Sequence, residues 1–456
     1  MTIGLGGTML IIIHGWSDGA SSFKSLARKL TSPGPDRLYS SEIRHLRLAD
    51  YISLDDEIGY DDLVEAMQRA WIKEELPTAP RSVDVIIHST GGLVVRHWLT
   101  NYFKPRTSPI KRLLMLAPAN FGSPLAHTGR SLIGRAVKGW KGTRLFETGT
   151  KILKGLEIAS PYSWSLAEKD IFAEEQYYGP GRILCTVLVG NIGYNGISAL
   201  ANKPGTDGTV RVSTANLNAT KLDLDFTLAQ ESVAITGRRD HGSTAFGIAD
   251  QEDHSSIAAK DGGPHRRSIW KLIREALKVE DSDFSKWQDT LTKHNQEVTQ
   301  KAERRRGTHH DSYQNTVIRV IDNQGSSVQD YVIEFFVNDD SGRRNRHRTR
   351  LLQENVVANV HAWCDDASYR SFLVNCTELS KILDKESDDL NISITASPDI
   401  MNRPVGYRTY TDEDISTLCL DQNALRDLFK PNRTLLITMK IKRYQKDNVF
   451  QFKSIN

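Results

Sequence analysis

The chain of 456 residues has little cysteine, and its cysteines lie far apart. They are Cys185, Cys364, Cys376 and Cys419. None of them has the short spacing to another ligand that a structural zinc site requires, and Cys185 falls in a strand-like apolar run. We therefore expect no metal site, no cofactor bound through cysteine and no disulfide framework.

The sequence also has no apolar run of transmembrane length, and it does not begin with a basic leader and a cleavage site. Residues 9–13 are therefore interpreted as a first core strand. Acidic and basic residues nearly balance, with a formal net charge of +3, which argues against a nucleic-acid partner. We expect a soluble chain made in the cytoplasm, with signal-independent export or attachment to an anionic membrane surface left open.

What the sequence does contain is a serine at a sharp turn between a strand and a helix. The apolar run at residues 83–87 leads into Ser89, and an apolar helical pattern follows Thr90 and Gly91. Such a turn is a nucleophile elbow, which presents the serine hydroxyl and points the next amide at a developing oxyanion. Chemistry at Ser89 is therefore the leading hypothesis.

The elbow is a degenerate form of the G-x-S-x-G pattern. Ile87 stands where the first glycine is usual, whereas Gly91 and Gly92 leave room for the helix to pack closely on the strands. A buried strand, a helix-capping serine and two packing glycines would give the same letters. Further residues must distinguish the two interpretations.

A serine nucleophile needs a histidine base and an acid that orients the base. In the chain order Ser, Asp, His, the candidates are Asp207, on a loop after a strand at 183–190, and His254, just before a helix near 266–277. An aspartate beside a glycine is also a common turn residue, and a loop histidine can cap a helix. His241 stays an alternative base, but the late position of His254 ahead of a helix is more typical of one.

The second oxyanion donor is expected in the loop after the first strand. There His14 and Gly15 form an H-G pair, and Gly15 lets the chain fold back so that the Trp16 amide points at the same spot as the Thr90 amide. His14 is then a structural residue that holds the loop, not a base.

These ordered motifs, together with L-A-P-A-N-F-G-S-P at 116–124, resemble the α/β-hydrolase lipases and esterases. The lecithin-cholesterol acyltransferase-like and inositol-deacylase-like branch is the nearest in character. The resemblance covers residues 9–277 and implies an acyl-enzyme mechanism that needs no metal, because backbone amides hold the oxyanion. The implied site consists of the nucleophile Ser89, the base His254, the orienting acid Asp207 and the oxyanion amides of Trp16 and Thr90.

The pattern of elements predicts an α/β fold followed by a second domain. Strand and helix patterns alternate over the first half, as in a mostly parallel, doubly wound sheet, and helical stretches at about 122–181 occupy the place of a cap or lid. We expect an α/β-hydrolase domain over 1–280, a charged helical linker over 281–312 and a β-sandwich-like domain over 313–456.

Taken together, the sequence predicts a serine hydrolase of carboxylic esters, of lipids or phospholipids more than of small soluble molecules. Two alternatives stay open: a small-ester or thioester hydrolase, and a non-catalytic scaffold that binds a protein partner through the C-terminal domain. The scaffold interpretation draws on Ile87, whose bulk at the elbow also indicates reduced or narrowly specialised activity.

Overall fold

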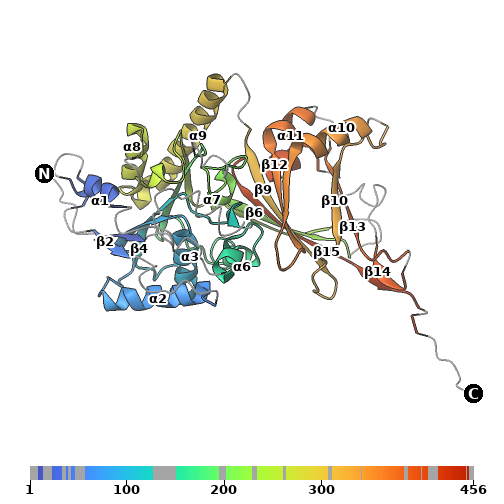
Figure 1. The fold of residues 1–456 in the computed structure, drawn as a ribbon, viewed down its shortest axis with the longest axis horizontal. Helices are drawn as coiled ribbons and strands as arrows, with labels where there is room; N and C mark the ends of the chain where they lie inside the picture. The colour runs from blue at the N-terminus through green and yellow to red at the C-terminus, as the bar shows by residue number, and fades with distance from the viewer. Residues whose placement is uncertain are drawn as a thin grey trace, which may run out of the picture. The chain divides into compact units, whose positions relative to one another are not determined.

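The structure is a computed structural model whose described part forms two compact units (Figure 1). Unit 1 comprises Met1–Asn218 and His241–His310, and unit 2 comprises Ala219–Asp240 and Asp311–Asn456. The described residues are 9–13, 23–32, 37–39, 43–46, 57–126, 150–194, 202–227, 234–259, 263–306, 311–339, 341–384, 389–401, 403–408, 420–447 and 449–450.

Unit 1 is built on a six-stranded parallel sheet in the order β2-β1-β3-β4-β5-β8. Every residue of the central strands β3 and β5 is buried, as expected for a parallel sheet covered on both faces. The strands are β1 (Met9–Ile13), β2 (Arg44–Leu46), β3 (Val83–His88), β4 (Ile110–Leu116), β5 (Leu184–Gly190) and β8 (Ala245–Ala249).

Helices cover both faces of this sheet. The connection from β1 to β2 runs toward one edge of the sheet, whereas the connections from β2 to β3 and from β3 to β4 run toward the other edge. Because each crossover is right-handed, α1 lies on the face opposite α2 and α3. Figure 1 shows α8 and α9 on the side of the sheet away from α2 and α3. The helices of unit 1 are α1 (Lys24–Thr31), α2 (Tyr60–Lys73), α3 (Gly91–Tyr102), α5 (Thr150–Leu156), α6 (Pro161–Lys169), α7 (Val212–Ala215), the 3₁₀ turn η5 (Ser256–Ala258), α8 (Arg267–Ala276), the 3₁₀ turn η7 (Asp281–Asp283) and α9 (Phe284–Arg306).

The region expected to form a cap is described only in part, because residues 127–149 lie outside the described residues. Of the remainder, α5 and α6 pack on the sheet-covering helices. The Tyr60 hydroxyl at the start of α2 donates to the Ile152 carbonyl of α5 at 3.4 Å, and the rings of Tyr60 and Tyr162 of α6 stack at 4.2 Å.

The charged linker expected over 281–312 is, over most of its length, a packed helix of unit 1. The apolar side of α9 lies on β8, with Phe284 and Leu291 fully buried. The Trp287 indole donates to the Thr186 hydroxyl of β5 at 3.0 Å, and the Asn295 side chain donates to the Phe246 carbonyl of β8 at 2.9 Å. Most exposed residues of α9 are charged or carry amides, and its apolar residues are few. The composition of the segment therefore predicted a solvated linker, although its few apolar residues form a buried stripe.

Unit 2 contains a six-stranded mixed sheet in the order β11-β12-β9-β15-β6-β7, an antiparallel β10-β13 pair and a β14-β16 pair. In the large sheet β15 is parallel to both β6 and β9. The strands are β6 (Ala219–Asp225), β7 (Ala234–His241), β9 (Tyr313–Asp322), β10 (Tyr331–Phe336), β11 (Val357–Ala362), β12 (Tyr369–Asn375), β13 (Asn391–Ala396), β14 (Val405–Tyr407), β15 (Thr434–Ile441) and β16 (Arg443–Gln445). The helices are α10 (Arg346–Leu351), the π-helical η8 (Leu352–Val356), α11 (Cys376–Ile382) and α12 (Gln422–Leu428).

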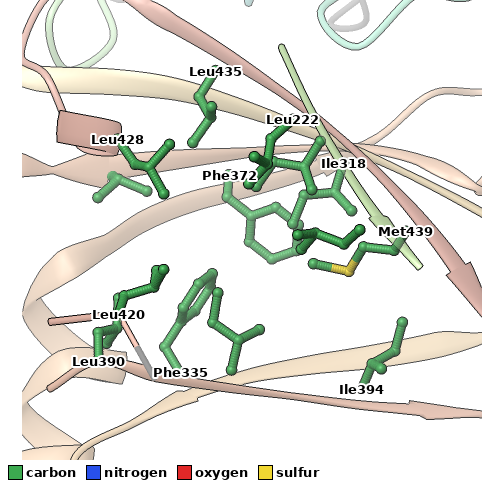
Figure 2. Packing of buried hydrophobic residues seen from close by; sticks show 14 of the residues in the cluster. Leu222, Ile318, Phe335, Phe372, Leu390, Ile394, Leu420, Leu428, Leu435 and Met439 are labelled. Carbon is green, nitrogen blue, oxygen red and sulfur yellow. The ribbon is translucent and has the colours of Figure 1, made fainter. Parts of the chain in front are cut away.

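The core of unit 2 lies between its six-stranded sheet and the β10-β13 pair. Figure 2 shows Ile318 and Phe372 of the large sheet facing Phe335 and Ile394 of the β10-β13 pair across an apolar layer. Two packed sheets around one core match the expected sandwich-like domain, with α10, α11 and α12 as additions.

The segment before the candidate base does not belong to unit 1, contrary to the expected boundary at residue 280. Residues 219–240 supply β6 and β7 to the sheet of unit 2. Every second side chain of this segment is buried in the unit 2 core, namely Leu222, Leu224 and Phe226. The segment therefore pairs with the sheet of unit 2 and not with the parallel sheet of unit 1. The short edge strand expected at 234–236 is therefore an edge strand of the second unit.

Candidate active site

The nucleophile candidate lies at the strained turn that the sequence predicts. Ser89 follows β3 directly and has a φ of 55°, a left-handed backbone that non-glycine residues adopt rarely. Its amide donates to the Leu116 carbonyl at 3.2 Å, and its carbonyl accepts from the Gly92 and Ala119 amides at 3.1 and 3.3 Å. The surrounding backbone therefore holds the strained conformation.

Close packing explains the glycine at position 92. A Cβ atom on Gly92 would lie 3.0 Å from Pro118 Cβ and 3.4 Å from Ile87 Cδ1. The tight approach is to Pro118, whereas the distance to Ile87 is that of an ordinary van der Waals contact. Ile87 is fully buried, and Ser89 Oγ still lies within hydrogen-bond distance of His254 Nε2.

The structure brings the three predicted triad residues together. His254 Nε2 lies 3.1 Å from Ser89 Oγ, and His254 Nδ1 lies 3.0 Å from Asp207 Oδ2. His254 is 3% exposed and Asp207 is fully buried. With Nδ1 donating its proton to the carboxylate, Nε2 carries the lone pair that can accept a proton from the serine hydroxyl.

The Asp207 turn is shaped to aim one carboxylate oxygen at the histidine. The other oxygen, Oδ1, accepts from the Thr209 and Val210 amides at 3.0 and 2.9 Å, and the Asp207 carbonyl accepts from the His254 amide at 2.9 Å. Gly208 has a φ of +100°, and a Cβ atom there would lie 2.6 Å from the Tyr194 ring. Only glycine fits this turn without displacing its neighbours.

Tyr194 covers this turn and keeps its proton. Its hydroxyl lies 2.8 Å from the Thr209 hydroxyl, and burial raises the pKa of Tyr194 well above its ordinary value. Tyr194 therefore supplies a neutral hydrogen-bonding wall beside the Asp207 carboxylate.

His88, next to the nucleophile, holds the loop of the candidate base, a role that the sequence alone did not suggest. His88 Nε2 lies 2.9 Å from the His254 carbonyl oxygen and therefore donates to it. The two imidazole rings lie 4.6 Å apart, and Phe23 packs edge-on against His88 at 5.8 Å. Its position immediately before Ser89 is the one signal that the sequence offered.

Glu252 anchors the same loop from the other side. Its buried carboxylate accepts from the Ser256 hydroxyl and from the His265 amide at 2.6 and 2.7 Å. The Glu252 carbonyl accepts from the Asn191 amide at 3.1 Å, which ties the loop to the end of β5. The loop of His254 is thus fixed at both ends by hydrogen bonds.

A buried ion pair behind the elbow fixes α3, and no local pattern in the sequence predicts it. Arg96 of α3 binds Asp170 through two hydrogen bonds of 2.7 and 2.9 Å, and its third donor reaches the Asn120 carbonyl at 2.9 Å. The Tyr178 hydroxyl donates to the same carboxylate at 2.9 Å. The pair locks α3 to α6 and to the loop after β4.

The predicted oxyanion donors are described in part. Thr90 is the residue before α3, and its amide makes no hydrogen bond within the described part of the chain, so it is available to a ligand. His14, Gly15 and Trp16 lie outside the described residues, and the role of this loop stays a prediction.

His241, the alternative base, lies elsewhere in unit 1. Its Nδ1 is 3.2 Å from Gln176 Oε1, and its ring packs edge-on against Tyr178 at 5.9 Å. The Ser89 hydroxyl is instead within hydrogen-bond distance of His254.

The described residues offer neither a metal-binding cluster nor a membrane-spanning helix. They contain no group of three or more histidine, cysteine, aspartate or glutamate side chains placed to hold a metal ion. No helix in the described ranges has the length and apolar composition needed to cross a bilayer.

Comparisons with known proteins give a match of the whole chain among solved structures. No protein-family model and no curated protein sequence matches the chain. The chain is similar to phospholipase PlaB from Legionella pneumophila, with a TM-score of 0.81 and 22% identity over 98% of this chain and 96% of that chain. A structure of that phospholipase in complex with thio-NAD gives a TM-score of 0.79 and 21% identity over the same shares. The Bacillus licheniformis lipase BlEst2 in its mature form gives a TM-score of 0.34 and 13% identity over 59% of this chain and 91% of that chain.

At this level of identity the likeness concerns the fold. The match to the Legionella protein covers 98% of this chain and therefore includes both units. The chain therefore has the predicted α/β-hydrolase fold followed by a β-rich domain.

Proposed function

We propose that the chain is a serine hydrolase that cleaves carboxylic ester bonds of lipids, acting as a phospholipase. The observation that carries this proposal is the unbroken hydrogen-bonded line from Ser89 Oγ through the His254 ring to Asp207, with distances of 3.1 and 3.0 Å. It is built on a positive-φ elbow at the end of a buried parallel strand. This combination is the apparatus of acyl transfer through a covalent intermediate.

The first half of the reaction forms an acyl-enzyme. Ser89 Oγ attacks the ester carbonyl carbon while His254 Nε2 takes the hydroxyl proton, and Asp207 stabilises the imidazolium that results. The carbonyl oxygen becomes an oxyanion that accepts a hydrogen bond from the Thr90 amide, with the Trp16 amide as the expected second donor. As the tetrahedral intermediate collapses, His254 gives its proton to the leaving alcohol.

The second half releases the acid. A water molecule gives a proton to His254 Nε2 and attacks the acyl carbon, so that the same oxyanion donors act again. The intermediate expels Ser89 Oγ, which recovers its proton from His254, and the products are a carboxylic acid and the free enzyme.

A phospholipid substrate is favoured over a small soluble ester by the whole-chain likeness to a phospholipase. The Legionella protein contains both units, so the likeness is not limited to the common hydrolase core. A scaffold without activity is disfavoured by the intact geometry around Ser89, which Ile87 does not disturb. The lecithin-cholesterol acyltransferase-like branch and a protein partner of unit 2 stay predictions.

The test is phospholipid hydrolysis by the full-length chain. Phosphatidylglycerol and phosphatidylcholine vesicles are incubated with the unmodified protein, Ser89→Ala and the matched control Ser285→Ala, and released fatty acid is quantified. We expect fatty acid release to fall by about 10⁴-fold or more in Ser89→Ala, because the nucleophile is lost. Release should stay unchanged in the control, because Ser285 is an exposed residue of α9.

A soluble short-chain nitrophenyl ester, assayed in parallel, separates the alternatives. Turnover of that ester without any release from vesicles would favour the small-ester hydrolase. Hydrolysis of both substrates that survives in Ser89→Ala would contradict the proposed mechanism.

A further inference from the structure

Helix α8 carries a stripe of exposed basic side chains. Arg267, Lys271 and Lys278 are exposed, and their spacing of four and seven residues places them on one side of the helix and its C-terminal extension. Ile269 and Ile273 are fully buried on the opposite side. The basic side of α8 therefore faces solvent while its apolar side anchors it to the sheet.

Helix α1 extends this basic surface. Lys24 and Arg28 are exposed and lie four residues apart, on the same side of α1. The two helices touch where Lys29 lies 4.2 Å over the Trp270 ring of α8. We call this surface the α1–α8 basic face, and it consists of Lys24, Arg28, Arg267, Lys271 and Lys278.

The charges of the α1–α8 basic face are not neutralised within the described residues. None of its five side chains has an ion-pair partner there, α1 contains no acidic residue, and Glu275 is the sole acidic residue of α8. Like charges four residues apart repel, and Lys24 and Arg267 oppose the dipoles of the helices that they begin. An external anionic surface would offset these unfavourable terms, because it attracts each of the five cationic side chains.

The basic face begins beside the candidate active site. Phe23, immediately before α1, packs against His88, which precedes the nucleophile. The amide of Arg266, immediately before α8, donates to Glu252 in the loop of the candidate base at 3.2 Å. The first residue of each helix therefore lies near the sheet edge that carries the triad.

We propose that the α1–α8 basic face docks unit 1 onto the headgroups of an anionic phospholipid bilayer and so brings the active-site edge to its substrate. This inference rests on the proposed phospholipase function. A membrane is favoured over a nucleic acid because the chain as a whole carries only +3 and because a phospholipid hydrolase must meet its substrate at a surface. If the basic face docks in this way, the rate of phospholipid hydrolysis depends on the fraction of anionic lipid in the bilayer.

The test measures vesicle binding independently of catalysis. Full-length protein carrying Ser89→Ala is sedimented with phosphatidylcholine vesicles or with vesicles that also contain phosphatidylglycerol. The face variant adds Lys24→Gln, Lys271→Gln and Lys278→Gln. The matched control adds Lys73→Gln, Lys104→Gln and Lys169→Gln, three exposed lysines without ion-pair partners in the described structure, on or beside α2, α3 and α6.

We expect the face variant to lose about 100-fold in partitioning to the anionic vesicles, because each lysine near such a surface contributes about a factor of five. The control, with the same change in net charge, should lose less than about 3-fold, since its charges lie off the docking surface. With Ser89 restored, hydrolysis of a soluble short-chain ester should be equal in the two triple variants. That assay shows that both fold, and total inactivity of the unmodified chain toward any ester would count against the proposed function without affecting the binding result.

Three outcomes would overturn the docking surface. They are equal losses in the two triple variants, binding to pure phosphatidylcholine that equals binding to the anionic vesicles, and preferential binding to duplex DNA. If the face variant does not fold, a salt titration of the Ser89→Ala protein tests the proposal instead. Its binding to anionic vesicles should weaken steeply between about 50 mM and about 500 mM NaCl, and binding that does not depend on salt would overturn the proposal.

Discussion

The candidate base His254 is held in place by a residue that is adjacent in sequence to the candidate nucleophile Ser89. His88 donates from Nε2 to the His254 carbonyl at 2.9 Å, and Ser89, one residue later, lies 3.1 Å from the His254 ring. One short segment of chain thus contacts both the backbone and the ring of the candidate base. His88 is a positioning residue, because its bond goes to the backbone of His254 and not to substrate.

Replacing His88 tests this role. His88→Gln keeps an N–H donor at a similar reach, whereas His88→Leu removes the donor at a similar volume. We expect His88→Leu to lower kcat by about 10–100-fold with little change in KM, since a shift of about 1 Å in a catalytic group costs a factor of this order.

The measurement is the steady-state hydrolysis of a soluble short-chain ester, with thermal unfolding as a check of the fold. Partial recovery of kcat in His88→Gln would support the positioning role. A normal kcat in a folded His88→Leu protein would refute it.

At the scale of single residues, the sequence allowed prediction of those site residues that stand in recognisable local motifs. Ser89, Asp207 and His254 lie in short segments whose turn and glycine patterns indicate a hydrolase loop. The bond of His88 to His254 and that of Arg96 to Asp170 join residues 166 and 74 positions apart. No local pattern foretells such pairs, because only the folded sheet brings their segments together.

At the scale of elements, helix α9 shows how composition can mislead. Charged and amide side chains dominate its sequence, yet Leu291 is fully buried against β8. A Cβ atom on Gly247 of β8 would lie 2.9 Å from Leu291 Cδ2, so the absence of a side chain there lets the helix approach the strand. Helix α9 is therefore a structural layer of unit 1.

The packing of α9 predicts a loss of stability on truncation of Leu291. Leu291→Ala should lower the free energy of unfolding by about 2–5 kcal/mol, because it leaves a cavity between helix and sheet. The exposed neighbour serves as the control, and Lys293→Ala should stay within about 0.5 kcal/mol of the unmodified protein. Urea unfolding followed by circular dichroism measures both, and equal stabilities would mean that α9 is the solvated linker that composition suggested.

The strands of the parallel sheet were easier to predict than those of the second unit. Short apolar runs alternating with helical patterns have few arrangements other than a doubly wound sheet. The sequence of β6 has the alternating pattern of a strand but does not indicate to which sheet the strand belongs. Its parallel partner β15 begins at Thr434, more than two hundred residues later in the chain. Its place in unit 2 depends on that distant pairing, which the sequence of β6 does not encode.

At the scale of the whole molecule, the chain passes repeatedly between its two units. It leaves unit 1 after Asn218, contributes β6 and β7 to unit 2, returns at His241 to build β8 and the loop of His254, and leaves again after His310. The candidate base is thus encoded after the first contribution to unit 2. Activity should be sought in the full-length chain, because no single cut separates the units.

The central claim is that Ser89, and no other serine, is an activated nucleophile, and labelling of the intact full-length protein with a fluorophosphonate tests it most directly. We predict one covalent adduct on the unmodified chain, mapped by peptide mass spectrometry to Ser89, and none on Ser89→Ala, because only a serine paired with a base reacts readily. Absence of labelling on the unmodified, folded chain, or an adduct that persists in Ser89→Ala, would contradict the account.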